Sequence, residues 1–362
     1  MENKTKKPKF NFVNIIDELN KQLKKKNIKI RNYIGEGGFG QVFEVVYDGK
    51  LKAGKIMDKE DKNMREEKFC QELRGPNIIK VNKIEHLRYF DEKKNKKSCD
   101  MIIMEKALLR DLGKFNEHFH RKNILKLIVE MPFKEKCSDY LLRYYSKQII
   151  DGFEVFDRNN LVHFDIKPGN ILVMNNLILK ISDFDFLRVV DDSMKEVYIH
   201  GGTDGYKGPE VYDNQNIITP DIARKQDYFA LGSTLFQFKY GKHLFKFNDN
   251  EKNSNFTDSI TDYLIEILLY NIDYIKAQIL DDEYLKQFII DLLQCNPKDR
   301  PCFEKIYRNK WLNKDLDICE DLARTYERAE EKLLMEFQKI DFLIRKDKSN
   351  ANKTKFKLKI KK

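Results

Sequence analysis

The feature that most constrains this chain is a polar loop, LVHFDIKPGN at residues 161–170, set between apolar segments. Apolar residues 171–173 and 177–181 follow it, separated by an Asn-Asn pair that favours a turn. The two apolar runs predict a β-hairpin. Such a hairpin would return the chain so that Asp183 comes back towards Asp165. A polar loop between a helix and a hairpin is common, so its function depends on the segments around it.

The N-terminal part of the chain reads as β-strands joined by short turns. Residues 30–35 and 41–47 flank a glycine-rich loop, Gly35-Glu36-Gly37-Gly38-Phe39-Gly40, in which backbone N–H groups can approach phosphates closely. Asp48-Gly49 marks a hairpin turn before a third strand at 50–57, which carries Lys55.

Glycine-rich loops of this kind also occur in dinucleotide-binding folds. There the loop joins a strand to a helix, and an acidic residue follows about 20 positions on. Here residues 42–46 (VFEVV) continue as a strand. A dinucleotide-dependent oxidoreductase is therefore disfavoured, and it would leave the motifs at Asp165 and Asp183 unexplained.

The order of these segments resembles that of the eukaryotic protein kinase family: a glycine loop, a hairpin with a lysine on its second strand, and polar motifs at 161–170 and 183–185. Two later segments add to the resemblance. GTDGYKGPE at 202–210 is similar to the family's GTxxYxAPE, and DYFALG at 227–232 is similar to DxWSxG. The matching region runs from about Lys29 to Trp311.

The resemblance implies an α+β, bilobal protein kinase fold over residues 28–312. A small β-rich N-lobe with one main helix would occupy about 28–104, and a larger α-helical C-lobe about 108–312. Further N-lobe strands are expected at 82–90 and 100–104, joined by a solvated charged turn. The C-lobe helices are expected at about 123–130, 139–160, 260–279 and 283–295.

The same resemblance implies Mg-ATP-dependent transfer of the γ-phosphate to protein hydroxyls. Asp165 would accept the proton of the substrate hydroxyl, and Lys167 would neutralise charge on the moving phosphoryl group. Asn170 and Asp183 would hold magnesium, a hard cation that prefers oxygen ligands. Lys55 would contact the α- and β-phosphates.

The implied ATP site also draws on the N-lobe and on the segment between the lobes. Lys55 would pair with a glutamate on a helix at about 63–74, where Glu66 is favoured and Glu67 is the rival. Met104 would lie beside the adenine pocket, followed by a hinge at 105–107. The ATP-binding residues are then Ile34, Gly35, Glu36, Gly37, Gly38, Phe39, Gly40, Val42, Ala53, Lys55, Glu66, Met104, Glu105 and Ala107. The implied structural residues are Glu210, Asp227 and Arg300, with an ion pair expected between Glu210 and Arg300.

The first departure from the family is Phe164, which replaces the arginine of H-R-D. That arginine normally anchors a phosphorylated activation loop through charge-assisted hydrogen bonds. Without it, we expect an enzyme that is not gated by a phosphate on Ser193, Tyr198 or Thr203.

Two further departures lie in the metal-binding and A-P-E motifs. Asp185 replaces the glycine of D-F-G, which should restrict the backbone there and add a carboxylate near magnesium. Gly208 replaces alanine in A-P-E, a change that we expect to be tolerated. Phe164 and Asp185 are the only support for an alternative, a pseudokinase that binds nucleotide and acts as a scaffold or allosteric partner. Lys167 and the Gly202-Thr203 pair resemble serine/threonine kinases.

Charge and cysteine content indicate which partners and which cellular compartment suit the chain. The net charge is +10, of which residues 1–31 carry +7 and residues 345–362 carry +8, so the body between them carries −5. Nucleic-acid binding by the core is therefore disfavoured, whereas the basic C-terminal tail would suit an anionic partner. Six cysteines without a CxxC pair favour a reducing compartment. No transmembrane run or secretory signal is recognisable, so we expect an intracellular protein, cytoplasmic or nuclear.

The two ends of the chain carry extensions to the catalytic region. Residues 1–27 have apolar side chains at helical spacing, which predicts a short amphipathic helix that packs on the catalytic body or binds a partner. Residues 313–344 predict a long amphipathic helix, for docking on the catalytic body, coiled-coil pairing or partner binding, although the heptad breaks between Ala329 and Phe337. Residues 345–362 predict a disordered basic tail.

Overall fold

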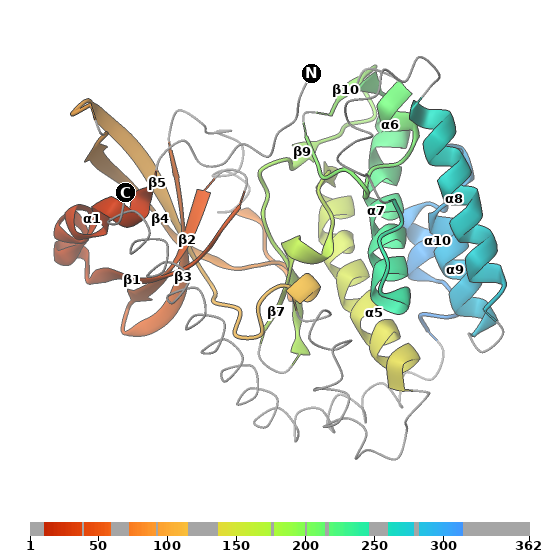
Figure 1. Cartoon of the computed structure of the whole chain (residues 1–362), viewed down its shortest axis with the longest axis horizontal. Helices are drawn as coiled ribbons and strands as arrows, with labels where there is room; N and C mark the ends of the chain where they lie inside the picture. The colour runs from red at the N-terminus through yellow and green to blue at the C-terminus, as the bar shows by residue number, and fades with distance from the viewer. Residues whose placement is uncertain are drawn as a thin grey trace, which may run out of the picture.

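The computed structural model describes residues 11–37, 40–58, 72–91, 93–114, 137–174, 177–199, 201–213, 217–245, 260–278 and 282–313. Figure 1 shows two lobes, a twisted sheet with a helix beside it and a larger group of helices. The predicted bilobal α+β fold is therefore confirmed. Among the described residues, no helix combines the length and the apolar character that crossing a bilayer requires.

Several predicted features lie outside the described residues. They are most of the helix at 63–74 with Glu66 and Glu67, the loop residues Gly38 and Phe39, the helix at 123–130, and the C-terminal segments beyond residue 313.

The N-lobe is built on one antiparallel sheet of order β1-β2-β3-β5-β4. Asp48 and Gly49 both adopt positive φ angles, 50° and 69°, as the turn between β2 and β3 requires. The strands are β1 (Ile28–Glu36), β2 (Gly40–Tyr47), β3 (Lys50–Asp58), β4 (Val81–Phe90) and β5 (Lys96–Met104).

The predicted start of β5 at residue 100 is wrong, because the strand begins at Lys96. The charged run that was expected to form a solvated turn is shorter than predicted. Asp91 Oδ1 accepts a hydrogen bond from Asn95 N at 2.7 Å, and Lys94 has a φ of 62°, so the chain reverses within 91–95. The polar residues 96–98 then pair with the end of β4, where a partly solvated edge tolerates them.

The N-terminal segment packs on the N-lobe sheet. A 3-10 turn at Phe12–Ile15 leads into α1 (Ile16–Leu23), which Figure 1 shows beside the strands. Phe12, Leu19 and Leu23 are buried with sheet residues, and Phe12 meets the Tyr89 ring edge to face at 5.5 Å. The backbone N–H of Phe12 also donates to Gln41 at 2.8 Å, so this segment is tied to the strand that leaves the glycine loop.

The C-lobe is organised around α7 (Pro220–Tyr240), which is buried on nearly all sides. Local sequence fixes both of its ends: Thr219 caps the first turn, and Gly241, at a φ of 65°, ends the helix in the left-handed conformation. Figure 1 shows the other helices around it. They are α5 (Cys137–Arg158), α6 (Glu210–Asp213), α8 (Ile260–Lys276), α9 (Glu283–Leu292) and α10 (Phe303–Tyr307).

Short strand pairs hold several loops of the C-lobe in place. The predicted hairpin after the polar loop is present, because β7 (Ile171–Val173) pairs with β8 (Leu179–Ile181). Two further ladders fasten the segment that follows Asp183 to its surroundings. They pair β6 (Leu161–Val162) with β9 (Arg188–Val189), and β10 (Val197–Tyr198) with β11 (Ile217–Ile218).

Candidate active site

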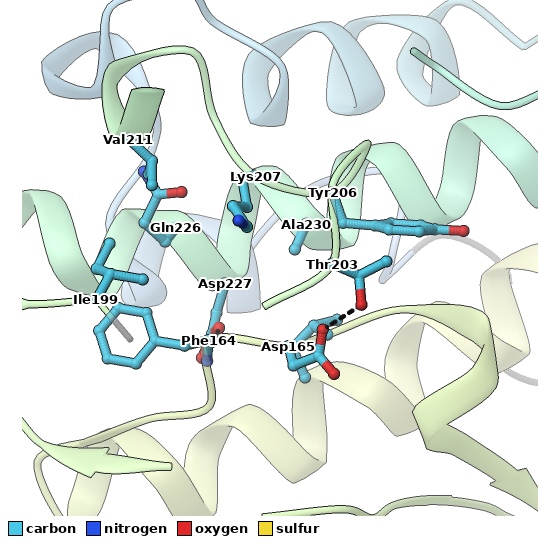
Figure 2. Close-up of a pocket in the computed structure, with 11 residues that line it drawn as sticks. Phe164, Asp165, Ile199, Thr203, Tyr206, Lys207, Val211, Gln226, Asp227 and Ala230 are labelled. Carbon is cyan, nitrogen blue, oxygen red and sulfur yellow. Dashed lines mark hydrogen bonds between the residues drawn. The ribbon is translucent and has the colours of Figure 1, made fainter. Parts of the chain in front are cut away.

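Asp165 lies at the centre of a polar network in the loop at residues 161–170, the predicted catalytic loop. Its Oδ2 accepts hydrogen bonds from Lys167 Nζ at 2.7 Å and Asn170 Nδ2 at 2.8 Å. Its Oδ1 accepts from Thr203 Oγ1 at 2.7 Å, which Figure 2 shows as a dashed line. Lys167 Nζ also lies 2.5 Å from Thr203 Oγ1. The loop and residue 203 are thus joined around one carboxylate.

The backbone of this loop is held in place by buried Asp227 on α7. Its two carboxylate oxygens accept from the backbone N–H groups of His163, at 2.6 Å, and Phe164, at 2.9 Å. Burial raises the pKa of Asp227 to about 7, against the opposing effect of these two hydrogen bonds. Phe164 has a φ of 63°, which is strained for a bulky side chain, so the Asp227 contacts stabilise an unfavourable backbone conformation.

His163 joins the catalytic loop to Ser182, which directly precedes the predicted metal motif at 183–185. Its Nε2 lies 3.1 Å from the Ser182 carbonyl oxygen, and its Nδ1 lies 3.2 Å from the Asp165 backbone nitrogen. These partners fit a neutral imidazole that donates from Nε2 and accepts at Nδ1. Burial lowers the pKa of His163, which favours the same neutral form.

The metal motif lies next to this loop because Ser182 bonds to Asn170. The Asn170 carbonyl accepts from Ser182 N at 2.9 Å and from Ser182 Oγ at 3.0 Å. Asp183 follows directly, and its Oδ1 lies 2.7 Å from Lys55 Nζ. Burial alone would raise the pKa of Asp183, but Lys55, Asp185 and Lys167 together outweigh its effect and hold the pKa well below its usual range.

The side chains of Asn170 and Asp183 offer oxygen atoms, which suit a magnesium ion that is also bound by phosphate groups. Both hydrogen bonds of the Asn170 side-chain amide use Nδ2, so its Oδ1 is the atom that it can offer to a metal. The Asp183 carboxylate supplies a second oxygen. Asn170 and Asp183 would hold such an ion together with the phosphates of a nucleotide. Among the described residues, no three His, Cys, Asp or Glu side chains gather in a metal-binding arrangement.

The strand register places the predicted adenine-side residues on one face of the sheet. Val42 pairs with Lys55, and Ala53 pairs with Met104. Because side chains alternate along a strand and directly paired residues share a face, these four residues point to the same side. Ile34, in contrast, lies on the outer strand β1 and is exposed.

Ion pairs tie the predicted hinge to both lobes. Glu105 Oε2 lies 2.7 Å from Lys180 Nζ on β8 and accepts from Lys80 N at 3.0 Å. Lys106 Nζ lies 2.7 Å from Glu44 Oε1 on β2. The Glu44 contact was not foreseen, although Glu44 shares the β2 face with Val42. Ala107 follows these two residues and is half-buried.

The described glycines of the glycine-rich loop differ in whether a side chain would fit at their position. Gly35 and Glu36 end β1, and Gly37 N donates to the Gly40 carbonyl at 2.9 Å across the loop. A side chain at Gly40 would place Cβ 2.5 Å from the Ile56 carbonyl oxygen, so glycine is required there by close strand packing. At Gly35 and Gly37, an added Cβ would meet no atom of the described residues within 4 Å.

The predicted ion pair between Glu210 and Arg300 is present. Arg300 Nη1 lies 2.6 Å from Glu210 Oε1, and Nη2 lies 2.8 Å from Oε2. The guanidinium is buried and stacks 4.6 Å from the centre of the Phe229 ring. This bidentate pair fastens the end of the predicted activation segment, residues 183–210, to the C-lobe.

Phe164 lies where the family has an arginine, and it packs into an apolar cluster. Figure 2 shows its ring beside Ile199, while Asp165 turns towards Thr203. The cluster joins β6, the activation segment, α6, β11 and α7. Its buried members are Val162, Phe164, Val190, Val197, Ile199, Val211, Ile218 and Ala223.

Further contacts of the site were not predicted from the sequence. Thr203 was considered as a phosphorylation site and as part of a serine/threonine-kinase-like pair, but its bonds to Asp165 and Lys167 were missed, although the GTxxY-like motif was a signal for them. Asp185 was expected to add a carboxylate near magnesium, and its contact with Lys55 was not predicted: both carboxylate oxygens lie 2.9 Å from Lys55 Nζ. The left-handed φ of this motif, 68°, belongs to Asp183, so an aspartate fits at position 185.

Comparison with known proteins agrees with this geometry. The model of the family described as protein kinase domain matches residues 28–312. Polo, a serine/threonine-protein kinase of Drosophila melanogaster, is 24% identical over 320 residues, covering 84% of this chain and 48% of polo. Smooth muscle myosin light chain kinase of Gallus gallus is 28% identical over 298 residues, covering 79% of this chain and 14% of that protein. An Aurora kinase of Eremothecium gossypii is 26% identical over 303 residues, covering 81% and 71%.

The matched region is thus about half of polo and a smaller part of myosin light chain kinase. The family model, in contrast, covers more than three-quarters of this chain. The two-lobed fold and the polar network around Asp165 agree with this match, and the chain belongs to the protein kinase family.

Proposed function

We propose that this chain is a serine/threonine protein kinase that transfers the γ-phosphate of ATP, bound with magnesium, to hydroxyl groups of protein substrates. The observation that carries the proposal is the joint arrangement of Asp165 with Lys167 and Asn170, beside Asp183 paired with Lys55. Phosphoryl transfer needs these groups together, because its catalysis is mainly positioning and electrostatic stabilisation.

In this proposal each residue has a role that its contacts support. Asp165 accepts the proton of the substrate hydroxyl, and its hydrogen bonds hold the carboxylate in one orientation. Lys167, close to Asp165, neutralises negative charge as the phosphoryl group moves. Lys55 binds the α- and β-phosphates, and Asn170 and Asp183 hold magnesium, which when bound neutralises phosphate charge.

Serine/threonine specificity is supported by the contact of Lys167 with Thr203. In this chain the two residues bond to each other and to Asp165, so they form one wall of the position that a substrate hydroxyl would take. The named relatives polo and Aurora kinase support the same class.

We further propose that the activation segment needs no phosphate to be ordered. Apolar packing around Phe164 joins Val197 and Ile199 to the catalytic loop. Arg224 on α7 donates to the Val190 carbonyl at 2.9 Å and pairs with Asp192 at 2.7 Å. These contacts supply the order that a phosphate-arginine pair would otherwise provide.

The test is transfer of labelled γ-phosphate from Mg-ATP to a generic serine/threonine substrate, with Asp165→Ala in parallel. We expect transfer that falls about 10²–10⁴-fold in the variant, the usual contribution of a general base. Phosphatase treatment of the protein should leave its activity unchanged. Activity that phosphatase abolishes, and that only rephosphorylation of the activation segment restores, would contradict the phosphate-independent proposal.

The pseudokinase alternative predicts a different outcome in the same assay. A folded protein that binds ATP but transfers no phosphate to itself or to substrate would support a scaffold or allosteric role. Phe164 and Asp185 are the residues that motivate it. Phe164 packs with apolar neighbours and Asp185 bonds to Lys55, and neither contact removes a group that the transfer requires.

A further inference from the structure

Lys55 is held by two carboxylates from one three-residue motif. Its Nζ lies 2.7 Å from Asp183 Oδ1 and 2.9 Å from both Asp185 Oδ1 and Oδ2. An ammonium group has three hydrogen-bond donors and no acceptor. Three carboxylate oxygens, one from Asp183 and two from Asp185, lie within hydrogen-bonding distance of the Lys55 ammonium. A glycine at position 185 could provide only the first of these contacts.

The two carboxylates differ in their access to solvent. The side chain of Asp183 is 31% exposed, whereas that of Asp185 is 8% exposed and that of Lys55 is 9% exposed. Asp183 therefore borders the open site, and Asp185 lies in the protein interior with the lysine. Because a buried pair is screened less by water and salt than an exposed one, Asp185 fixes the ammonium more firmly than a surface contact would.

The backbone around Asp185 is also held firmly. Phe184 and Leu187 are buried on either side of it, and Leu187 N donates to the Phe184 carbonyl at 3.1 Å, which closes a tight turn. On the lysine side, Lys55 is paired with Val42 and with Ile102 in the sheet. The carboxylate and the ammonium are thus presented by two rigid elements, so their contact is organised before any ligand binds.

We propose that Asp185 is a positioning residue for Lys55. Its carboxylate holds the ammonium where the α- and β-phosphates of a nucleotide bind. Position 185 thereby gains a function that the family's glycine cannot have. This inference rests on the proposed function of Lys55 as the phosphate-binding residue.

A competing role for Asp185 would give the opposite result. If Asp185 withheld Lys55 from phosphates, its removal would free the ammonium and tighten nucleotide binding. If it positions Lys55, its removal lets the ammonium shift towards Asp183, and nucleotide binding weakens. The direction of the change in nucleotide affinity therefore separates the two roles.

The experiment is a double-mutant cycle on the full chain, read out by titration of a fluorescent ATP analogue in the presence of Mg²⁺. Asp185→Asn should raise the dissociation constant about tenfold, whereas Asp185→Glu, which keeps the charge, should stay within about threefold of wild type. In a Lys55→Met background, Asp185→Asn should have no further effect. Non-additivity of this kind is the mark of a residue that acts through Lys55.

Thermal unfolding of each variant provides the folding control. If Asp185→Asn fails to fold because it strands a buried polar group, Asp185→Gly carries the test, since it removes the carboxylate and leaves no polar side chain. Unchanged or tighter binding in the charge-free variants would overturn the proposal. Equal weakening in the wild-type and Lys55→Met backgrounds would also overturn it.

The readout is independent of phosphate transfer, so the two proposals can fail separately. If the variants show the expected coupling but the wild-type protein transfers no phosphate, Asp185 remains a positioning residue and the kinase activity is refuted. A wild-type protein that transfers phosphate but shows no coupling between Lys55 and Asp185 would refute only this inference.

Discussion

Phe164 and Asp165 are neighbours in the chain, yet they belong to two environments of opposite character. Asp165 faces a polar network in which Lys167, Asn170 and Thr203 surround one carboxylate. Phe164 faces an apolar cluster that reaches the activation segment. The two sides are separated by a single peptide bond, and Asp227 holds the backbone between them.

The comparison shows two ways of fixing the same loop. The polar side orients groups that take part in chemistry, and each of its hydrogen bonds has a defined direction. The apolar side stabilises the loop by burying apolar surface. This contribution is not directional, because its free energy is roughly proportional to the apolar area removed from water. Changes on the two sides should therefore be separable: one should reduce activity at constant stability, and the other should reduce stability first.

The largest stability effect is expected on the apolar side. Phe164→Ala removes a buried ring and leaves a cavity, which should lower the free energy of unfolding by about 3–5 kcal/mol. Phe164→Leu, which keeps most of the volume, should cost less than about 1.5 kcal/mol. Urea denaturation measures both. Phe164→Ala as stable as wild type would mean that the cluster does not hold the activation segment.

On the polar side, Thr203→Val keeps the shape of the side chain and removes its hydroxyl. Asp165 and Lys167 each lose a hydrogen bond to this group, and bonds to charged partners contribute about 1.5–3 kcal/mol. We expect kcat/KM to fall roughly 10- to 100-fold. Thr203→Ser, which keeps the hydroxyl, is the matched control and should retain activity. Full activity of the valine variant would remove Thr203 from the site.

The polar side of the comparison was largely predictable from the sequence, and the apolar side was not. Asp165, Lys167, Asn170 and Asp183 stand in motifs whose spacing fixes their order around a hairpin. That Phe164 joins Val197 and Ile199 depends on where the activation segment folds back, which no local pattern encodes. The sequence showed only that an arginine was absent.

The same distinction explains the contacts that were missed. The contact of the Asp185 carboxylate with Lys55 depends on the backbone of the motif, including the positive φ of Asp183, which residue types alone do not reveal. The contact between Glu44 and Lys106 joins residues 62 positions apart and needs the strand register to be known.

The junction between the two sides should respond to pH through His163. Burial lowers the pKa of His163 in the folded protein, although Asp165 and Asp183 act in the opposite direction. Below pH 6.5, the ordinary histidine pKa, the unfolded chain then binds a proton that the folded protein does not. Stability is therefore lost as the pH falls below 6.5, by at most about 1.4 kcal/mol per pH unit.

Urea denaturation at pH 7.5 and pH 5.5 tests this linkage, with His163→Gln as the comparison. The variant cannot take up a proton at this position, so its stability should depend less steeply on pH than that of the wild type. Parallel pH dependences in the two proteins would show that His163 is not the group responsible.

The smallest effect is expected at Gly208, at the far end of the activation segment. A Cβ there would lie 2.4 Å from Glu210 Oε2, which Arg300 holds in a bidentate pair, so the carboxylate would have to move. Overpacking of this kind costs about 1–3 kcal/mol. Replacing glycine also lowers the conformational entropy of the unfolded chain, which offsets about 0.4–1 kcal/mol of this cost. We therefore expect Gly208→Ala to lower the free energy of unfolding by about 1 kcal/mol.

Gly169→Ala is the matched control for this prediction, because its nearest neighbour to an added Cβ is Lys167 Cε at 3.8 Å, an ordinary contact distance. It should be neutral or slightly stabilising in urea denaturation. If Gly208→Ala is instead as stable as Gly169→Ala, the Glu210 carboxylate can shift without loosening Arg300. The end of the segment would then be held by adaptable packing, like the side around Phe164, and not by directed bonds like those of Asp165.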